Sequence, residues 1–333
     1  MPTPPSSNRA LSRGYLIALT CAAFLSTTAI FIRHLTQTYH IPPLVLAFWR
    51  DCFVVVTLFP VLGLLNPSLL KIGCPTPARK LLYLCGYGLI LAIFNIFWTL
   101  SVALNGAAVA TVLVYCSAAF TAILGHWFLR ESLGWAKLLA IILSLGGCAL
   151  VSGVVDPAAW RANLIGISAG ILSGLSYAGY SLMGRSAANR GLNPWTTLFY
   201  TFGCATLFLL VVNLIPGPWL PGAAARPADL FWLKDALTGW AVLFALAAVP
   251  TVLGFGLYNV SLGYLPAGVV NLIATTEPVF TTVIAYVLLG ERLNGVQIGG
   301  GLLILGGVVF LRIYEEWAGR RPENAGKITA AKS

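Results

Sequence analysis

The chain has 333 residues, of which 58% are hydrophobic and only 9% carry a formal charge. Soluble domains carry roughly 25% charged residues, so this composition excludes a water-soluble globular fold and predicts a protein embedded in a lipid bilayer. The net charge of +10 would suit a nucleic-acid partner, but its distribution along the chain argues against one.

Apolar runs long enough to cross a bilayer follow one another along the whole chain. A helix needs about 20 apolar residues to cross a hydrocarbon core of roughly 30 Å. The sequence predicts an all-α membrane protein with ten transmembrane helices. Their ranges are 14–35, 44–65, 80–102, 105–128, 134–154, 162–184, 194–214, 238–261, 265–289 and 295–313. Two pairs of spans are nearly fused, because Asn105-Gly106 and Leu265-Pro266 are the only breaks between them.

The basic residues separate by side of the membrane. If the N-terminal tail, residues 1–13, is cytoplasmic, 14 of the 20 Lys and Arg residues fall in inside segments and five in outside segments, while Arg50 lies within a span. Segments rich in Lys and Arg stay in the cytoplasm. We therefore expect both termini to be cytoplasmic, including the basic tail 314–333, in a multi-pass protein of a bacterial inner membrane. The charge reports topology, and no nucleic-acid partner is predicted.

The chain contains an internal repeat. A shift of 160 residues aligns 101–150 with 261–310 and gives eleven identities, including Glu131 with Glu291. The predicted halves, 14–155 and 162–313, hold five spans each. Because five is odd, the second half enters the membrane from the opposite side. Inverted repeats are typical of secondary transporters, whose substrate site lies near the midplane between the halves.

The second half carries the most specific motifs, in the order Glu277-Pro278-Val279-Phe280, Leu288-Leu289-Gly290-Glu291-Arg292-Leu293, Gln297-Ile298-Gly299-Gly300 and Leu305-Gly306-Gly307. In these motifs the chain resembles the drug/metabolite transporter superfamily, specifically its EamA-type ten-helix members. The resemblance implies a secondary transporter, with exporters of amino acids, aromatic ones included, or of related small metabolites as the nearest expectation. Ser117-Ala118 replaces Glu277-Pro278 in the first half, so the halves cannot contribute identical groups.

Glu277 is the leading candidate for substrate binding or coupling. It lies twelve residues into the ninth span, where an ionisable group is costly unless it faces a cavity or a partner. The following Pro278 removes a helix hydrogen bond and can free carbonyl groups toward a cavity. The alternative is a structural hydrogen-bonding role between packed helices.

Arg50 and Asp51 lie in the second span, near its outer end. They form either a gate or a substrate charge clamp. In the packing alternative, Arg50 extends toward the interface and Asp51 bonds a neighbouring helix. Adjacent residues point in different directions on a helix, so the two need not pair with each other.

Further polar and aromatic residues near the midplane could line a cavity for a small amphipathic or aromatic solute. The set is Asn95, Trp98, Thr99, Tyr115, Ser117, Tyr177, Tyr180, Tyr258, Asn259, Asn271 and Thr275. Singly, each is as well explained by helix packing. Glu131 and Glu291 precede the fifth and tenth spans, where an acid complements the helix dipole. The glycines of the tenth span suit close packing or a homodimer contact.

An enzymatic function finds little support. Gly166-Ile167-Ser168-Ala169-Gly170 matches the GxSxG pattern, but a nucleophile elbow needs a strand-to-helix turn, and this match lies in an apolar helix. HExxH and P-loop patterns are absent. We predict no catalytic residues, no metal and no cofactor. A non-transporting membrane receptor or assembly protein with the same fold remains the alternative, because fold alone does not fix function.

Overall fold

The computed structural model describes residues 8–70, 77–151, 164–215, 220–280, 283–284 and 295–330. These segments are helices and connections, with no strand among them. The first repeat contributes α1 (Asn8–Leu25), α2 (Thr28–Thr38), α3 (Pro43–Leu65), the 3-10 turn η1 (Pro67–Leu70), α4 (Pro77–Tyr115), α5 (Ser117–Leu129) and α6 (Trp135–Val151). The second contributes α7 (Leu164–Asn189), α8 (Pro194–Leu214), the 3-10 turn η3 (Pro227–Phe231), α9 (Leu237–Leu246), a π-helical turn (Ala247–Thr251), α10 (Val252–Tyr264), α11 (Ala267–Ala274) and α13 (Gly295–Ala330).

The predicted all-α membrane fold is confirmed. Five helical stretches are long and apolar enough to cross a membrane, namely Ala10–Thr38, Pro43–Leu65, Ala78–Val102, Pro194–Leu214 and Leu237–Tyr264. Four shorter apolar helices, Leu113–Leu129, Trp135–Leu150, Ala267–Phe280 and Ile298–Leu311, coincide with further predicted spans. The sixth predicted span is α7, which is long enough to cross but carries many Gly, Ser and Tyr residues.

The third and fourth spans are joined without a break in helical backbone. α4 is helical through Asn105-Gly106, where the sequence predicted an interruption. The helical path nevertheless bends back between Ser101 and Leu113, because a Cβ atom placed on Gly170 would lie 2.8 Å from Ser101 Oγ and 2.7 Å from Leu113 Cβ. Twelve residues of straight helix would separate Ser101 from Leu113 by about 18 Å. The break between the eighth and ninth spans lies where it was predicted, at Leu265-Pro266.

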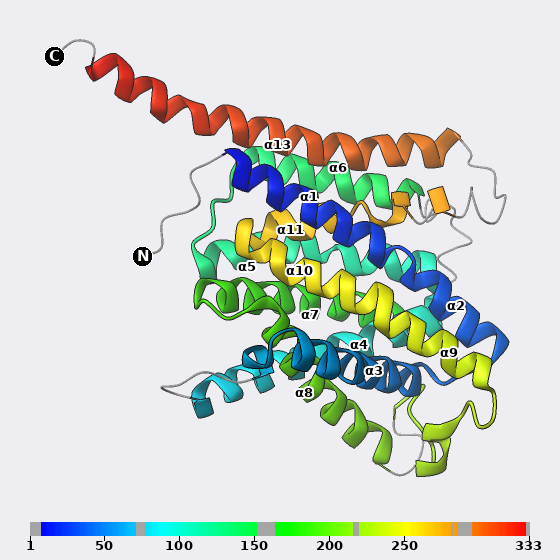
Figure 1. The fold of residues 1–333 in the computed structure, drawn as a ribbon. Helices are drawn as coiled ribbons and strands as arrows, with labels where there is room; N and C mark the ends of the chain where they lie inside the picture. Colours follow the sequence, from blue (N-terminus) through cyan, green and yellow to red (C-terminus); the bar gives the residue numbers. More distant parts are fainter. Residues whose placement is uncertain are drawn as a thin grey trace.

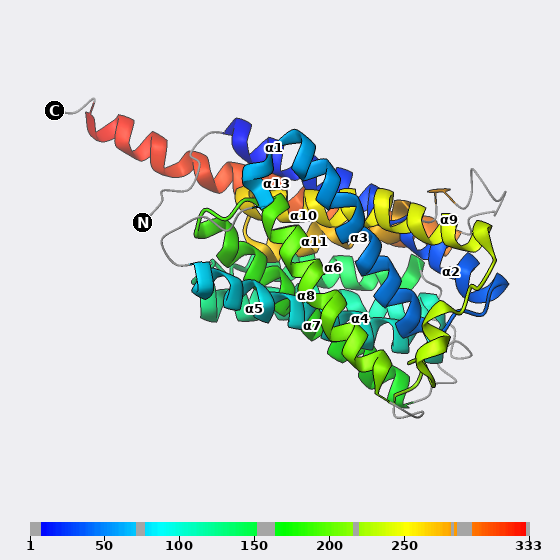
Figure 2. The same cartoon turned by 60° about the horizontal axis from the view of Figure 1, so that its bottom comes forward.

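The helices lie roughly along one axis, and the two chain ends point toward the same end of the bundle (Figure 1). α7 occupies the centre and contacts α4, α5, α10 and α11. α1 packs on α10, and α3 packs on α8, which Figure 2 brings to the front. Helices of one repeat thus pack mainly on helices of the other, so the core lies along the interface between the halves.

α6 and α13 form a separate layer along one edge of the bundle (Figure 1). They meet through glycine: a Cβ atom on Gly147 would lie 2.6 Å from the carbonyl oxygen of Gly300. A Cβ atom on Gly307 would likewise lie 3.0 Å from the carbonyl oxygen of Ala140. Small residues allow this close approach of backbones in lipid. The inner face of this layer belongs to the buried core, and Cys148 Sγ of α6 lies 3.6 Å from the carbonyl oxygen of Thr275.

Candidate functional site

Glu277 meets the other repeat through a hydrogen bond. The hydroxyl of Tyr115, the last residue of α4, donates to Glu277 Oε2 at 2.7 Å. Tyr115 is buried and Glu277 is partly buried. An ionisable group at this depth is stabilised by such a donor. The bond joins residues 162 positions apart, one from each half.

Both halves interrupt a helix at this point. α4 ends at Tyr115 and α5 starts at Ser117, while α11 ends at Ala274 and helix resumes over 277–280. The shift of 160 residues that reveals the repeat carries Tyr115 onto Thr275. Interrupted helices at corresponding positions of inverted repeats are the usual position of transporter binding sites, because the break leaves backbone groups unbonded within the helix.

A hydroxyl and amide network surrounds Asn271 on α11. Its amide Nδ2 donates to Thr121 Oγ1 at 3.0 Å and to Ser181 Oγ at 2.9 Å, and its Oδ1 accepts from Ser117 Oγ at 2.8 Å. Ser181 also bonds the hydroxyl of Tyr258 at 2.6 Å. All five side chains are buried. The network links α5, α7, α10 and α11, and therefore couples both halves.

An aromatic cage lies beside this network. Tyr177 stacks on Tyr180 with ring centroids 6.2 Å apart and lies 5.5 Å from the ring of Tyr258. Tyr87 and Tyr180 donate their hydroxyls to Asn259 Oδ1 at 3.2 and 3.4 Å. Asn259 Nδ2 is buried without a hydrogen-bond partner among the described residues. An unsatisfied buried donor is costly, which makes this amide a candidate to bond a solute.

Arg50 and Asp51 do pair, although adjacent residues on a helix need not. Arg50 Nη2 lies 3.1 Å from Asp51 Oδ1 and donates to Asn95 Oδ1 at 2.6 Å. Asn95 Nδ2 donates to Asp51 Oδ2 at 2.8 Å. The exposed fraction is 3% for Arg50 and zero for Asp51 and Asn95. The cluster joins α3 to α4 within the first repeat.

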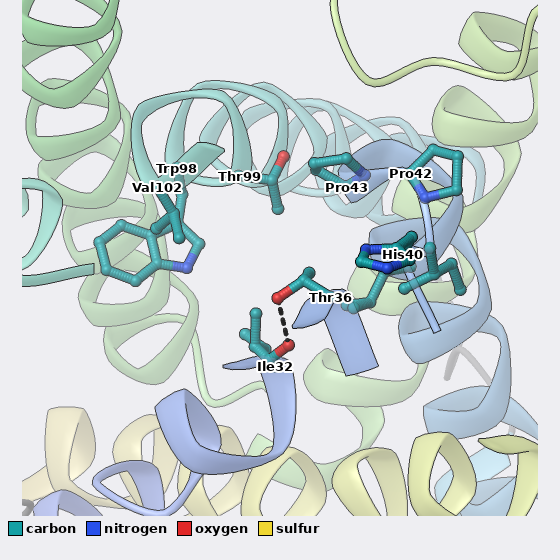
Figure 3. A pocket seen from close by; sticks show the side chains of 10 residues that line it. Ile32, Thr36, His40, Pro42, Pro43, Trp98, Thr99 and Val102 are labelled. Atoms are coloured by element: carbon teal, nitrogen blue, oxygen red, sulfur yellow. Dashed lines mark hydrogen bonds between the residues drawn. The ribbon is translucent and has the colours of Figure 1, made fainter. Parts of the chain in front are cut away.

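A cavity of about 390 Å³ opens at one end of the bundle, above this cluster. Figure 3 shows Trp98 and Val102 on one side and His40 with Pro42 on the other. Leu46 and Thr99 also line it, and they lie one helical turn from Arg50 and Asn95 respectively. Thr99 Oγ1 donates to the carbonyl oxygen of Asn95 at 2.7 Å. The walls are mainly apolar, with hydroxyl, imidazole and indole groups among them.

The predicted residues thus fall into four groups. Glu277 and Tyr115 bridge the halves. Thr275 lies at the helix interruption beside them, and its hydroxyl donates to the carbonyl oxygen of Leu272 at 2.6 Å. A second group is the buried network and cage, with Ser117, Tyr177, Tyr180, Tyr258, Asn259 and Asn271. Arg50, Asp51 and Asn95 form a separate cluster, while Trp98 and Thr99 line the cavity.

Sequence reasoning missed three members of the site. Thr121 and Ser181 are hydroxyls within small-residue stretches, and their partners lie 150 and 90 residues away. Tyr87 lies in the first part of α4, away from the expected midplane. Only Thr121 carried a sequence signal, its identity with Thr281 in the repeat.

Glu131 acts on a different helix from the one expected. Its Oε1 accepts the backbone N–H of Ala267 at 2.8 Å, so it caps α11 of the other repeat instead of the fifth span. Its repeat equivalent, Glu291, and the motif 288–293 lie outside the described residues. Among the described residues no group of His, Cys, Asp or Glu is arranged to hold a metal ion.

Comparison with known proteins gives the same fold and a function class. The sequence model of the EamA-like transporter family matches residues 12–153 and again residues 164–313. An uncharacterized transporter of Synechocystis is 28% identical over 231 residues, which are 69% of this chain and 66% of that protein.

Two relatives are called probable amino-acid metabolite efflux pumps. The one from Salmonella typhimurium is 28% identical over 276 residues, which cover 81% of this chain and 85% of the Salmonella protein. The one from Escherichia coli is 25% identical over 274 residues with the same coverage. A solved structure titled "Crystal structure of protein" superposes with a TM-score of 0.69 at 17% identity, over 91% of this chain and 98% of that one. That likeness establishes the fold alone.

Proposed function

Because the chain belongs to the EamA-like transporter family, we propose that it is a secondary transporter that exports small metabolites, such as amino acids, by alternating access. Family and relatives make it a multi-pass membrane transporter. The amino-acid class rests on the names of two relatives, and export rests on the same names.

The observation that carries the proposal is the Tyr115–Glu277 hydrogen bond at the paired helix interruptions. An ionisable group between two inverted halves is exposed first to one side and then to the other when the halves rock. Glu277 then serves substrate binding or proton coupling. The network around Asn271 and the amide of Asn259 supply further polar groups, and the tyrosine rings supply flat apolar surface for a solute.

The proposal includes an orientation in the plasma membrane. The distribution of Lys and Arg favours cytoplasmic termini. With that orientation, the loop between α2 and α3 is external, and the cavity lined by His40 and Trp98 opens outward. The loop that carries Glu131 then faces the cytoplasm.

A homodimer through the tenth span is part of the proposal in a narrower form than the sequence suggested. The faces of α13 at Gly300 and Gly307 already meet α6. A Cβ atom on Gly295, Gly299 or Gly306 would meet nothing within 4 Å. In the part of α13 that the structure describes, this second face is open to another copy, and cross-linking of Gly306→Cys tests it.

Flux through the purified protein in liposomes tests the function. We expect protein-dependent movement of amino acids or related metabolites, and counterflow of labelled substrate when the lumen is preloaded. Absence of flux for every metabolite class would favour a non-transporting receptor or assembly protein. Neither outcome depends on knowing the coupling ion.

Glu277→Gln tests the site within that assay. Gln keeps an acceptor for Tyr115 and a similar volume but removes the titratable group. We expect transport to fall by about tenfold or more and its pH dependence to flatten. Asp229→Asn, in an external turn where the partly exposed Asp229 pairs with Arg226, is the matched control and should transport normally. If Glu277→Gln keeps both the rate and the pH profile, Glu277 is structural.

A further inference from the structure

Glu131 reaches from the first repeat to the start of a helix in the second. Its Oε1 accepts the N–H of Ala267 at 2.8 Å and its Oε2 accepts the N–H of Gly268 at 3.4 Å. These amides open α11, whose first turn has no intrahelical acceptors for them. N-terminal caps are normally supplied by the residue just before the helix. This cap comes from a position 136 residues earlier.

A buried lysine holds the cap in place. Lys137 Nζ lies 3.6 Å from Glu131 Oε2, and the two side chains are 7% and 8% exposed. Lys137 Nζ also donates to the carbonyl oxygen of Ser132 at 3.3 Å. A Cβ atom on Gly268 would lie 2.8 Å from Lys137 Cε, so the lysine stem packs directly against the start of α11. Screening by solvent is weak at such a site, unlike that of a surface ion pair.

This contact lies at the end of the bundle opposite the cavity. The cavity is lined by the end of α2, the start of α3 and the middle of α4. Glu131 follows α5, and in Figure 1 the end of α5 and the start of α11 lie toward the termini, away from α2 and α9. At the same end, Arg185 Nη1 of α7 donates to the carbonyl oxygen of Leu262 on α10 at 2.6 Å.

α11 connects this contact to the candidate site. It carries Asn271 one turn after the capped amides, and its end at Ala274 leads directly into Thr275 and Glu277. A rigid helix of eight residues transmits the position of its first turn to its last. Any rocking that opens this end must separate Glu131 from α11, because the two belong to different halves.

We propose that Glu131, held by Lys137, is a positioning residue that latches the transport path shut at this end, and that the latch must release in each cycle. The inference rests on the proposed alternating access. In the described conformation the latch is made, while the opposite end holds an open cavity. Weakening the latch shifts the protein toward the conformation open at the Glu131 end, since each state's population follows its relative free energy.

Two reporter cysteines read this shift in the full-length protein. Ala122→Cys lies behind the latch: Ala122 is 1% exposed and its Cα would lie 3.4 Å from a Cβ atom on Gly268. Val102→Cys lies in the wall of the cavity at the other end. Labelling of each by a membrane-impermeant maleimide is measured in detergent, above the signal of the same protein without the reporter.

Glu131→Gln and Lys137→Met are the latch variants. Gln keeps an acceptor for the Ala267 amide but loses the ion pair. We expect labelling of Ala122→Cys to rise by roughly fivefold or more and labelling of Val102→Cys to fall. If Glu131 and Lys137 serve only to hold the fold together, the substitutions should loosen it and raise the labelling of both reporters. That result overturns the proposal. Unchanged labelling of both reporters overturns it as well.

Asp229→Asn is the matched control. Asp229 accepts the backbone N–H of Arg226 at 3.0 Å and pairs with its side chain at 3.4 Å, but both residues belong to one external turn. The Asp229→Asn substitution should leave the labelling of both reporters unchanged. The double change Glu131→Lys with Lys137→Glu should fail to restore wild-type labelling, because lysine cannot accept the Ala267 amide. If the double variant restored wild-type labelling, the contact would be a simple ion pair, and the latch proposal would be wrong.

The labelling needs no substrate, so it separates this inference from the transport function. Opposed changes of the two reporters without any flux would support the latch and count against transport. Flux in the wild type with reporters that do not move would support transport and overturn the latch.

Discussion

Two of the buried polar clusters in the membrane-spanning part of this protein are built differently. Arg50, Asp51 and Asn95 belong to neighbouring helices of one repeat, carry balanced charge and bond one another. Tyr115 and Glu277 belong to different repeats and meet where both helices are interrupted. A cluster within one half can stay intact while the halves move, whereas a bond between halves cannot. We therefore propose that the first cluster serves stability and the second serves transport.

Breaking the charge balance of the first cluster should have the largest effect on stability. Asp51→Asn leaves Arg50 buried without its counter-charge, and removal of one partner of a buried pair costs about 3–5 kcal/mol. We expect a large drop in the thermal unfolding midpoint in detergent. Arg50→Gln combined with Asp51→Asn removes both charges and should recover much of the loss.

The same two variants test the gate interpretation of Arg50 and Asp51. If the double variant is stable and transports normally, the pair serves packing. If it is stable but has lost transport selectively, the pair is a gate or a charge clamp, and the contrast between the two clusters fails.

Asn271→Leu should have the next largest effect, because it acts on both stability and transport. The change strips hydrogen-bond partners from Ser117, Thr121 and Ser181 at nearly constant volume. Unsatisfied buried groups cost about 1–3 kcal/mol, and Ser181 keeps its bond to Tyr258. Unfolding and flux measured on the same preparation should both decline. A stable variant with normal flux would remove this network from the candidate site.

The fold was largely predictable because its signals are local. Apolar length marks the spans, the odd number of spans per half forces inversion, and Glu277 stands out as a charge in an apolar run. The site was less accessible, because its members are ordinary hydroxyl and amide residues whose partners come from distant segments. The interruption at Cys116 has no Pro or Gly to mark it. The sequence did not indicate that Glu131 caps α11, because the helix start nearest to Glu131 along the chain is that of α6.

The layer of α6 and α13 offers a contrast outside both clusters. Gly147→Ala places a methyl group 2.6 Å from the carbonyl oxygen of Gly300 and should cost about 1–3 kcal/mol. Gly146→Ala, at a position of α6 where an added Cβ atom would meet nothing within 4 Å, is the matched control and should change stability by no more than about 0.5 kcal/mol. Neither should alter the substrate KM, because the atoms nearest to an added Cβ atom on Gly147 belong to α13 and none lies within 4 Å of one on Gly146. A raised KM in Gly147→Ala would extend the site into this layer.

Tyr115→Phe should have the smallest effect and is the most specific test of the second cluster. It deletes one hydroxyl and keeps the ring, so the loss is that of a single hydrogen bond, about 1 kcal/mol or a severalfold fall in transport kcat/KM. If the hydroxyl acts through Glu277, Tyr115→Phe should have a smaller effect in the Glu277→Gln background, where the acceptor is neutral. Equal effects in both backgrounds would mean that Tyr115 serves the cage independently. The bond between the halves would then be a packing contact, and transport would have to depend on the network around Asn271 instead.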